Sequence, residues 1–338
     1  MPANVFINGF GRIGRLVLRA IAEGKRGRDI NVVGINDLGP VETNAHLFRY
    51  DSVHGRYAGE VKTTKDSIDI GMGPMTVTAE PDPAKLPLKK LKTDIVLECT
   101  GRFTTRESAE ELLKAGARRV LVSAPATGVE RTVVYGINHE TIDKADTVVS
   151  NASCTTNCLA PLAWVLHQAF GIERGFMTTV HAYTSDQRLQ DALHGDLHRS
   201  RAAALSMIPT STGAARAVGL VLPELKGKLD GTSIRVPTAN VSVVDLKAVV
   251  SKPTSVEAVN EALKKAARGK LKGVLAVNEE PLVSIDFNHI PASSTADLPQ
   301  TAVVDGTLVR VMSWYDNEWG FSNRMVDTAV YMAKQLGK

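Results

Sequence analysis

Three glycines near the start of the chain, in the stretch INGFGRIG, constrain the fold more than any other feature. Gly9, Gly11 and Gly14 have the spacing G-x-G-x-x-G and directly follow residues 4–8, an apolar run typical of a buried strand. In a turn between a strand and a helix, the first glycine permits the tight turn, the second lets the backbone approach a pyrophosphate, and the third lets the helix pack on the sheet. Glycine triplets at this spacing are common, so the motif carries weight only in its context.

The neighbouring residues supply that context. Residues 12–24 predict a helix with one apolar face, and residues 30–38 predict a second buried strand that ends at Asp37; the apolar face consists of Ile13, Leu16, Val17, Ala20 and Ile21. Strand, glycine turn, helix and strand form a βαβ unit, whose helix N–H groups would meet phosphate charge. The Asp37 carboxylate would accept hydrogen bonds from an adenosine ribose and repel a 2′-phosphate. The sequence therefore predicts an NAD site, with a glycine-rich turn beside a solvated Asp37 as the alternative.

Strands and helices continue to alternate up to about residue 153, and strands dominate after it. The alternation predicts an α/β fold with a Rossmann-type doubly wound parallel sheet, followed by a second α+β domain built on a mostly antiparallel sheet. We expect residues 1–153, completed by a C-terminal helix at 320–338, to form the NAD-binding domain and residues 154–319 to form the catalytic domain. Beyond the first βαβ unit, residues 94–101 predict a strand followed by a turn. Further strands are predicted at 119–125, 132–138, 147–153, 175–183, 231–250, 281–287 and 307–316, and helices at 107–117, 158–170, 212–225, 255–267 and 323–336.

Composition narrows the class of protein. The 338 residues are 43% hydrophobic, enough for a sizeable core, and the net charge of +4 is spread along the chain. This mild basicity fits small phosphorylated substrates as well as nucleic acid, and no basic stripe interleaved with aromatics is present. No apolar run approaches the roughly 18 residues of a membrane span, and the N-terminus lacks the pattern of a signal peptide. Three cysteines fit no disulfide framework, so we expect a cytoplasmic protein.

One of these cysteines lies in unusual surroundings, the polar stretch SNASCTTN at 150–157. Ser153 is a good N-cap residue, so Cys154 is expected at a helix N-terminus, where partial positive charge lowers a thiol pKa. The best candidate for a base is His181, at the end of an apolar strand. A small buried cysteine and a structural histidine remain the alternatives. Cys154 and Cys158 lack a further Cys/His pair at ligand spacing, so no metal site is expected.

The two predicted sites together indicate a reaction. A nicotinamide cofactor accepts hydride and an activated thiol adds to carbonyls, which suits oxidation of an aldehyde through a thioester. A cysteine hydrolase using Cys154 and His181 is an alternative, although it would have no use for the glycine turn and Asp37. A non-catalytic role, such as RNA binding in the cofactor groove, is a third.

Longer motifs extend this interpretation over essentially the whole chain. The stretches are INGFGRIGR, NDLGPVETNAHLFRYDSVHGR, SNASCTTNC, PTSTGAARAVGLVLPELKGKLDG, RVPTANVSVVDL and SWYDNEWGFSNRM. With them the chain resembles the phosphorylating glyceraldehyde-3-phosphate dehydrogenases. The resemblance implies oxidation of D-glyceraldehyde 3-phosphate with NAD and inorganic phosphate to 1,3-bisphosphoglycerate. It also implies that Cys154 forms a hemithioacetal and then an acyl-thioester, and that His181 accepts the hydroxyl proton.

The resemblance assigns further residues by position. For the cofactor it implies Gly9, Gly11, Gly14, Arg12, Ile13, Asp37, Ser123 and Asn317; for the phosphates and substrate it implies Ser153, Thr155, Thr184, Arg199, Thr212, Gly213 and Arg235. An arginine inside the apolar stretch SIRVP needs an anionic partner, whereas sequence alone leaves Arg199 equally compatible with a solvated loop.

Two departures and one rival accompany the resemblance. Pro81 stands where many relatives carry Arg or Lys near the adenine, and Ala192-Leu193 replaces a Leu-Pro pair often associated with NAD specificity. Erythrose-4-phosphate dehydrogenase is the nearest rival, but the Thr184, Thr212 and Gly213 positions favour the triose phosphate. The family also implies a homotetramer, in which residues 183–205 would form an arm at a subunit interface. No membrane partner and no obligatory nucleic acid are expected.

Overall fold

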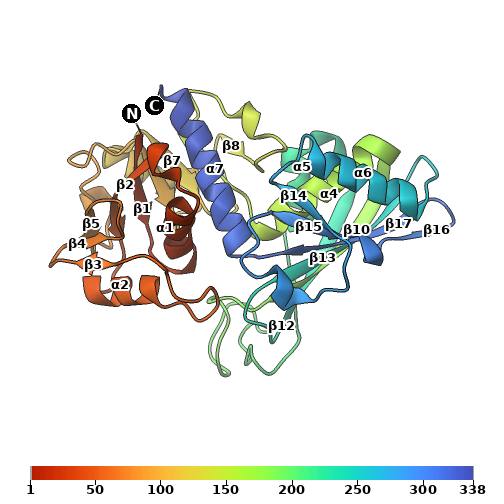
Figure 1. Ribbon diagram of the computed structural model, residues 1–338, viewed down its shortest axis with the longest axis horizontal. Helices are drawn as coiled ribbons and strands as arrows, with labels where there is room; N and C mark the ends of the chain where they lie inside the picture. Colours follow the sequence, from red (N-terminus) through yellow and green to blue (C-terminus); the bar gives the residue numbers. More distant parts are fainter. Residues whose placement is uncertain (1, 338) are drawn as a thin grey trace. The chain divides into compact units, whose positions relative to one another are not determined.

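The computed structural model describes residues 2–337, and the chain divides into two compact units (Figure 1). The first unit contains the chain up to Tyr135, the segment His139–Ala152 and the C-terminal segment from Ser322. The second contains Gly136–Asn138 and Ser153–Phe321. Each unit has its own sheet.

The first unit is built on a nine-stranded sheet with the order β3-β4-β5-β2-β1-β6-β7-β9-β8. All neighbouring strands are parallel except the β3–β4 and β4–β5 pairs. The strand order reverses at β1, which lies between β2 and β6, and ligands of such sheets bind at the carboxyl ends of the strands at this switch point. The strands are β1 Ala3–Asn8, β2 Ile30–Asn36, β3 Lys62–Thr63, β4 Ser67–Asp69, β5 Met75–Thr78, β6 Ile95–Glu98, β7 Arg119–Val122, β8 Arg131–Thr132 and β9 Val148–Ser150.

The helices of this unit carry the apolar faces that their sequences predict. In α1, Leu16, Val17, Ala20 and Ile21 are buried, as expected, whereas Ile13 is only half-buried. In α7, the apolar stripe formed by Met325, Val326, Ala329, Val330 and Ala333 is buried throughout. The helices are α1 Arg12–Glu23, α2 Val41–Arg49, α3 Arg106–Lys114 and α7 Trp319–Gln335 (whose first residues belong to the second unit), with short 3-10 helices η1 Arg26–Arg28, η2 Pro83–Lys85 and η3 His139–Thr141.

A buried arginine fastens the end of α7 to the first sheet. Arg119 in β7 is only 1% exposed, and its guanidinium donates to the Met332 carbonyl, to Gln335 Oε1 at 2.9 Å and to the Asp143 carbonyl. A cation facing the carbonyls of a helix C-terminus is also favoured by the helix dipole. These contacts explain why the last helix completes the first unit.

Replacing Arg119 with methionine should therefore lower the free energy of unfolding by roughly 2–4 kcal/mol, because the Asp143 and Met332 carbonyls would lose their charged donor. The control is Lys114→Met, because the Lys114 side chain is exposed on the surface of the same unit, where it pairs with Glu111. That variant should change stability far less than Arg119→Met does. Urea denaturation would measure both; equal midpoints would show that Arg119 does not fasten the helix.

The second unit is built on a mixed sheet with the order β11-β12-β10-β13-β17-β15-β14, and β16 pairs with β17. Most pairs are antiparallel; β10–β12 and β14–β15 are parallel. Helices α4, α5 and α6 lie together against this sheet (Figure 1). The strands are β10 Ile172–Ala182, β11 Ile208–Ser211, β12 Leu229–Val236, β13 Ser242–Val250, β14 Leu275–Asn278, β15 Ser294–Asp297, β16 Ala302–Val304 and β17 Leu308–Tyr315; the helices are α4 Cys154–Phe170, α5 Ala214–Val221 and α6 Val256–Arg268, with η4 Pro223–Leu225, η5 Ser284–Phe287 and η6 Leu298–Gln300.

Two predicted strands are wrong in whole or in large part. Residues 281–287 end in the 3-10 helix η5, because the Asp286 carboxylate accepts the Val283 N–H and so stabilises a turn. Of residues 132–138 only the first belongs to a strand, and Gly136 has a positive φ of 87° that ends the extended conformation. Within residues 2–337 no helix combines the length and the apolar character that crossing a bilayer requires.

Candidate active site

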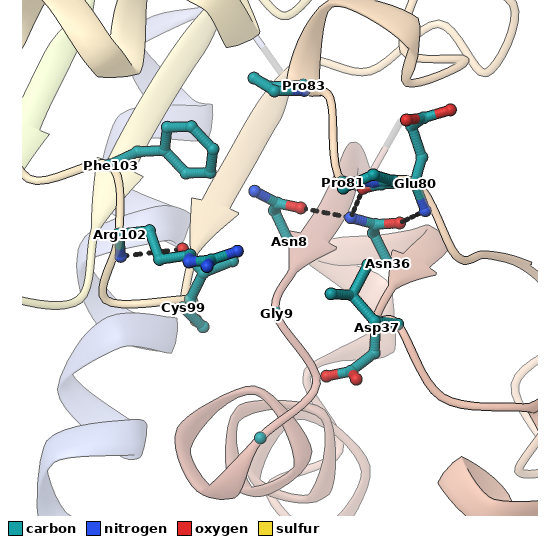
Figure 2. Close-up of a pocket in the computed structure, with 13 residues that line it drawn as sticks. Asn8, Gly9, Asn36, Asp37, Glu80, Pro81, Pro83, Cys99, Arg102 and Phe103 are labelled. Atoms are coloured by element: carbon teal, nitrogen blue, oxygen red, sulfur yellow. Dashed lines mark hydrogen bonds between the residues drawn. The ribbon is translucent and has the colours of Figure 1, made fainter. Parts of the chain in front are cut away.

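A cavity of about 250 Å³ opens at the carboxyl ends of β1, β2 and β6 in the first unit (Figure 2). It is lined by the glycine turn, by the end of β2 with Asp37, by Glu80, Pro81 and Pro83, and by the turn after β6, which includes Cys99 and Thr100. This is the switch point of the sheet, where an α/β fold places its ligand.

The three glycines have different surroundings in this cavity. A Cβ on Gly9, which has a φ of +90°, would lie 2.6 Å from the Thr100 nitrogen, and a Cβ on Gly14 would lie 2.0 Å from the Gly9 carbonyl oxygen. A Cβ on Gly11 would meet no atom within 4 Å. Gly9 and Gly14 are therefore required by packing, whereas Gly11 presents its backbone to open space, as a bound pyrophosphate would need. The residues present fit a dinucleotide.

The other predicted cofactor residues differ in what they offer. Asp37 is half-buried at the cavity; its Oδ2 accepts the Phe10 N–H at 2.8 Å. The Arg12 guanidinium pairs with Asp51 at 2.6 Å, so Arg12 and Ile13 offer the backbone of the first turn of α1. Ser123, directly after β7, is not among the described residues that line the cavity, and its N–H donates to the Glu98 carbonyl.

In the second unit, Cys154 and His181 come together. Ser153 caps α4, with its Oγ accepting the Thr156 N–H at 3.0 Å, so Cys154 is the first residue of the helix. His181 lies near the end of β10, and its Nε2 is 3.5 Å from the Cys154 Sγ. The His181 Nδ1 is 2.6 Å from the Ala182 carbonyl oxygen. A carbonyl only accepts, and this contact is shorter than the 3.3 Å approach of Arg235 Nη1 to the same nitrogen. The proton therefore lies on Nδ1, and Nε2 is the acceptor that faces the sulfur.

The electrostatics of this pair differ from the sequence expectation. Burial and then the positive charge of Arg235 lower the pKa of His181 to about 3, so its ring is neutral. Burial raises the pKa of the Cys154 thiol, although the Arg235 charge and hydrogen bonds at the start of α4 oppose this. The expectation of a lowered thiol pKa is therefore wrong for the free protein: loss of solvent outweighs the helix N-terminus. The site holds a thiol beside a neutral base.

Arg235 is the nearest positive charge to this pair. It is the β12 register partner of His181, and its Nη1 lies 3.2 Å from Thr184 Oγ1 and 3.3 Å from the Ala182 carbonyl. No carboxylate of the described residues forms an ion pair with it, and its Nε is buried without a hydrogen-bond partner. A half-buried guanidinium with an unused donor is suited to bind an anion.

The remaining predicted substrate residues are engaged within the protein. Arg199 pairs with Asp186 at 2.8 Å, and its Nε donates to Thr210 Oγ1 at 3.0 Å. Thr212 Oγ1 accepts the Ala214 N–H at 3.2 Å, where Gly213 caps α5. Arg199 also lies 3.6 Å from the Asp196 carboxylate, so, unlike Arg235, it would have to share or exchange carboxylate partners before binding a phosphate.

Tyr315 was missed by the sequence analysis. Its hydroxyl lies 2.9 Å from both Thr155 Oγ1 and Thr179 Oγ1, and its ring meets the His181 ring edge-on with centroids 5.9 Å apart. It thus ties the start of α4 to β10 and fixes the imidazole. The alternating burial of β17 could have identified it as an inward-facing polar residue.

Asn317 is buried, and its Oδ1 accepts from Ser242 Oγ at 2.8 Å, so its amide NH₂ is the group that it can offer a ligand. Across the described part of the chain, no cluster of His, Cys, Asp and Glu could hold a metal ion.

Comparisons with known proteins show the family of the chain. Residues 3–106 match the model of the glyceraldehyde 3-phosphate dehydrogenase NAD binding domain, and residues 153–317 match that of its C-terminal domain. Glyceraldehyde-3-phosphate dehydrogenase of Xanthobacter flavus is 68% identical over 334 residues, covering 99% of each chain. Its counterpart in Cereibacter sphaeroides is 63% identical over 336 residues, covering 99% of this chain and 100% of the relative. The chain is an NAD-dependent dehydrogenase that belongs to the glyceraldehyde-3-phosphate dehydrogenase family.

Proposed function

We propose that the protein converts D-glyceraldehyde 3-phosphate, NAD and inorganic phosphate to 1,3-bisphosphoglycerate, with Cys154 carrying the acyl group. The observation that supports this most directly is the 3.5 Å approach of Cys154 Sγ to the unprotonated Nε2 of His181. The relatives named as glyceraldehyde-3-phosphate dehydrogenases support the choice of substrate.

In the proposed reaction, Cys154 Sγ attacks the aldehyde carbon as its proton moves to His181 Nε2. His181 passes that proton on to the carbonyl oxygen, which becomes the hydroxyl of a hemithioacetal and leaves the imidazole neutral again. His181 then accepts the hydroxyl proton as the carbon is oxidised to a thioester. Bound NAD supplies the hydride acceptor for that oxidation. Phosphate oxygen attacks the thioester carbon, the C–S bond breaks, and Cys154 leaves as the sulfur anion beside Arg235.

Each remaining predicted residue is proposed for a definite group. Arg235 and Thr184, which lie 3.2 Å apart, would bind the phosphate of the substrate. Ser153, Thr155, Arg199, Thr212 and Gly213 are proposed for the substrate and the attacking phosphate. NAD would be bound by the glycine turn, Arg12, Ile13, Asp37 and Ser123. The Asn317 amide would bind the carboxamide group of the nicotinamide.

Steady-state rates would test the proposal. With glyceraldehyde 3-phosphate and NAD, we expect sustained NADH formation only when inorganic phosphate is present, and without it a burst no larger than the enzyme concentration. A turnover rate that is the same with and without phosphate would exclude an acyl phosphate as the product. A higher kcat/KM with erythrose 4-phosphate than with glyceraldehyde 3-phosphate would identify the activity as that of an erythrose-4-phosphate dehydrogenase.

We also propose a cytoplasmic homotetramer in which residues 183–205 lie at a subunit interface. This segment exposes apolar side chains that a monomer would leave in water: Leu189, Leu193, Leu197 and Leu205 are 82–94% exposed. Sedimentation equilibrium would report the oligomeric state directly. The three free cysteines are consistent with a reducing compartment.

A further inference from the structure

A continuous row of polar side chains crosses four strands beneath the cofactor cavity. Glu98 ends β6, Asn8 ends β1, Asn36 ends β2 and Thr78 ends β5, and each is the register partner of the next. Asn8 Nδ2 donates to Glu98 Oε2 at 2.6 Å, Asn36 Nδ2 donates to Asn8 Oδ1 at 2.9 Å, and Thr78 Oγ1 donates to Asn36 Oδ1 at 2.8 Å. Figure 2 shows the Asn8–Asn36 step. We call these four residues the Glu98 ladder.

The direction of every hydrogen bond in the Glu98 ladder is set by the backbone. Asn36 Oδ1 accepts the Glu80 N–H and Asn36 Nδ2 donates to the Glu80 carbonyl, both at 2.9 Å, so the Asn36 amide cannot be flipped. Its NH₂ therefore faces Asn8 Oδ1, and the Asn8 NH₂ faces Glu98. Glu98 Oε2 has to be an acceptor.

The other oxygen of Glu98 is also an acceptor. Oε1 receives the Thr100 N–H at 2.8 Å and is contacted by the Thr100 hydroxyl, which itself accepts the Arg102 N–H at 3.0 Å. A proton on either Glu98 oxygen would lie next to an N–H donor. Thr100 Oγ1 is the acceptor to which such a proton could be donated, and the Thr100 hydroxyl proton would then lose Glu98 as its own acceptor. The hydrogen bonds donated to both oxygens therefore stabilise the ionised carboxylate.

Solvent exclusion opposes that ionisation. Glu98 is 1% exposed, and burial raises its pKa to about 7 against the hydrogen bonds from Thr100 and Asn8, which lower it. None of the cations in residues 2–337 forms an ion pair with it. The adjacent titratable group is Cys99, whose pKa is raised by burial and by the Glu98 charge, so it stays neutral.

Other charged groups around the cavity come from different elements. Asp37 follows β2, Glu80 follows β5 and Arg102 follows β6. The Asp37 carboxylate already accepts the Phe10 N–H. Of the charged residues at this edge, Glu98 is the one whose hydrogen bonds run directly into cavity-lining side chains.

The Glu98 ladder connects directly to surfaces that a ligand would touch. Asn8, Asn36 and Thr100 line the cavity, and the Thr100 backbone is the surface against which Gly9 packs. Loss of the hydrogen bonds to Glu98 would leave both the Asn8 amide and the turn at Thr100 without the carboxylate that holds them in place. We propose that Glu98 is a positioning residue that holds the floor of the NAD cavity only when ionised, and so makes NAD affinity depend on pH near neutrality. This inference rests on the proposed placement of NAD in this cavity.

The direction in which NAD affinity changes with pH follows from the ionisation of the Glu98 carboxyl group. Above the Glu98 pKa of about 7 the carboxylate holds the ladder, and below it protonation disrupts the ladder. If only the ionised form binds NAD well, the Kd at pH 6 should exceed that at pH 8 by about tenfold, because about one molecule in eleven is then competent. Calorimetric titration of the apoenzyme with NAD between pH 6 and pH 8 would measure this.

The test variant is Glu98→Gln, which keeps the shape but turns a donor toward either Asn8 or Thr100. We expect its Kd for NAD to be raised about tenfold at pH 8 and to be constant from pH 6 to pH 8. The matched control is Asp94→Asn, a buried carboxylate just before the opposite end of β6 that accepts the Asn4 N–H at 2.9 Å. It should keep the wild-type pH dependence even if it lowers the unfolding temperature.

The possible outcomes test the positioning role of Glu98 separately from the placement of NAD in the cavity. A wild-type Kd that does not change between pH 6 and pH 8, or a Glu98→Gln variant that keeps the wild-type slope, overturns the positioning role. If Glu98→Gln does not fold, Thr78→Val removes the donor at the far end and should raise the Kd at pH 8; an unchanged Kd again overturns the proposal. Normal NAD affinity in Gly11→Leu, which would fill the cavity, would instead refute the placement of NAD.

Discussion

Replacing Cys154 with serine should abolish the oxidation of glyceraldehyde 3-phosphate, lowering kcat roughly 10³-fold or more, because a neutral hydroxyl is a far weaker nucleophile than the sulfur. NAD affinity should be unchanged, since the cavity at the glycine turn is lined by residues 8–103. The measurement is NADH absorbance under saturating substrate, together with calorimetric titration of NAD into the variant.

Cys158→Ser is the matched control on the same helix. Cys158 is fully buried, burial raises the pKa of its thiol to about 12, and its sulfur lies near Ser294 Oγ and the Ser313 carbonyl. A serine hydroxyl can donate to that carbonyl, so the control should fold and turn over. Wild-type rates in Cys154→Ser would exclude the covalent mechanism, and loss of activity in both variants would show that the first result reports disturbed packing of α4.

Local sequence signals predict the elements that carry the site because each depends on neighbouring residues. The glycine spacing predicts the turn between β1 and α1, since Gly9 has no room for a Cβ, and Ser153 predicts the start of α4 through its own hydrogen bond to the helix. The alternation of β17 and the apolar stripe of α7 predict which faces are buried.

The features that the sequence does not reveal depend on residues far apart in the chain. Arg119 reaches Met332, and Tyr315 reaches Thr155, and neither contact leaves a local pattern. The pKa of Cys154 was misjudged for the same reason: a helix N-terminus can be recognised from Ser153, but the loss of solvent around the sulfur depends on the whole fold. Ladder residues such as Asn8 and Glu98 end strands that look apolar, so only the register shows that they meet.

Replacing His181 with glutamine should lower kcat by about 10²–10⁴-fold, because the Cys154 thiol then has no base to accept its proton. Burial raises the pKa of that thiol, so the anion would have to form by ionisation alone, and both the residual activity and the rate of alkylation by iodoacetamide should rise with pH up to and beyond pH 9. In the wild type, His181 has a pKa of about 3 and is therefore unprotonated and able to accept the thiol proton at every pH above about 5. At pH 7, Cys154 should therefore be alkylated faster in the wild type than in the variant. His194→Gln is the control and should keep the wild-type profile, because the His194 ring lies in the same unit and contacts Asp186 and the Asp196 backbone. Identical pH profiles for wild type and His181→Gln would mean that the imidazole takes no proton from the sulfur, and the 3.5 Å contact would then be a matter of packing alone.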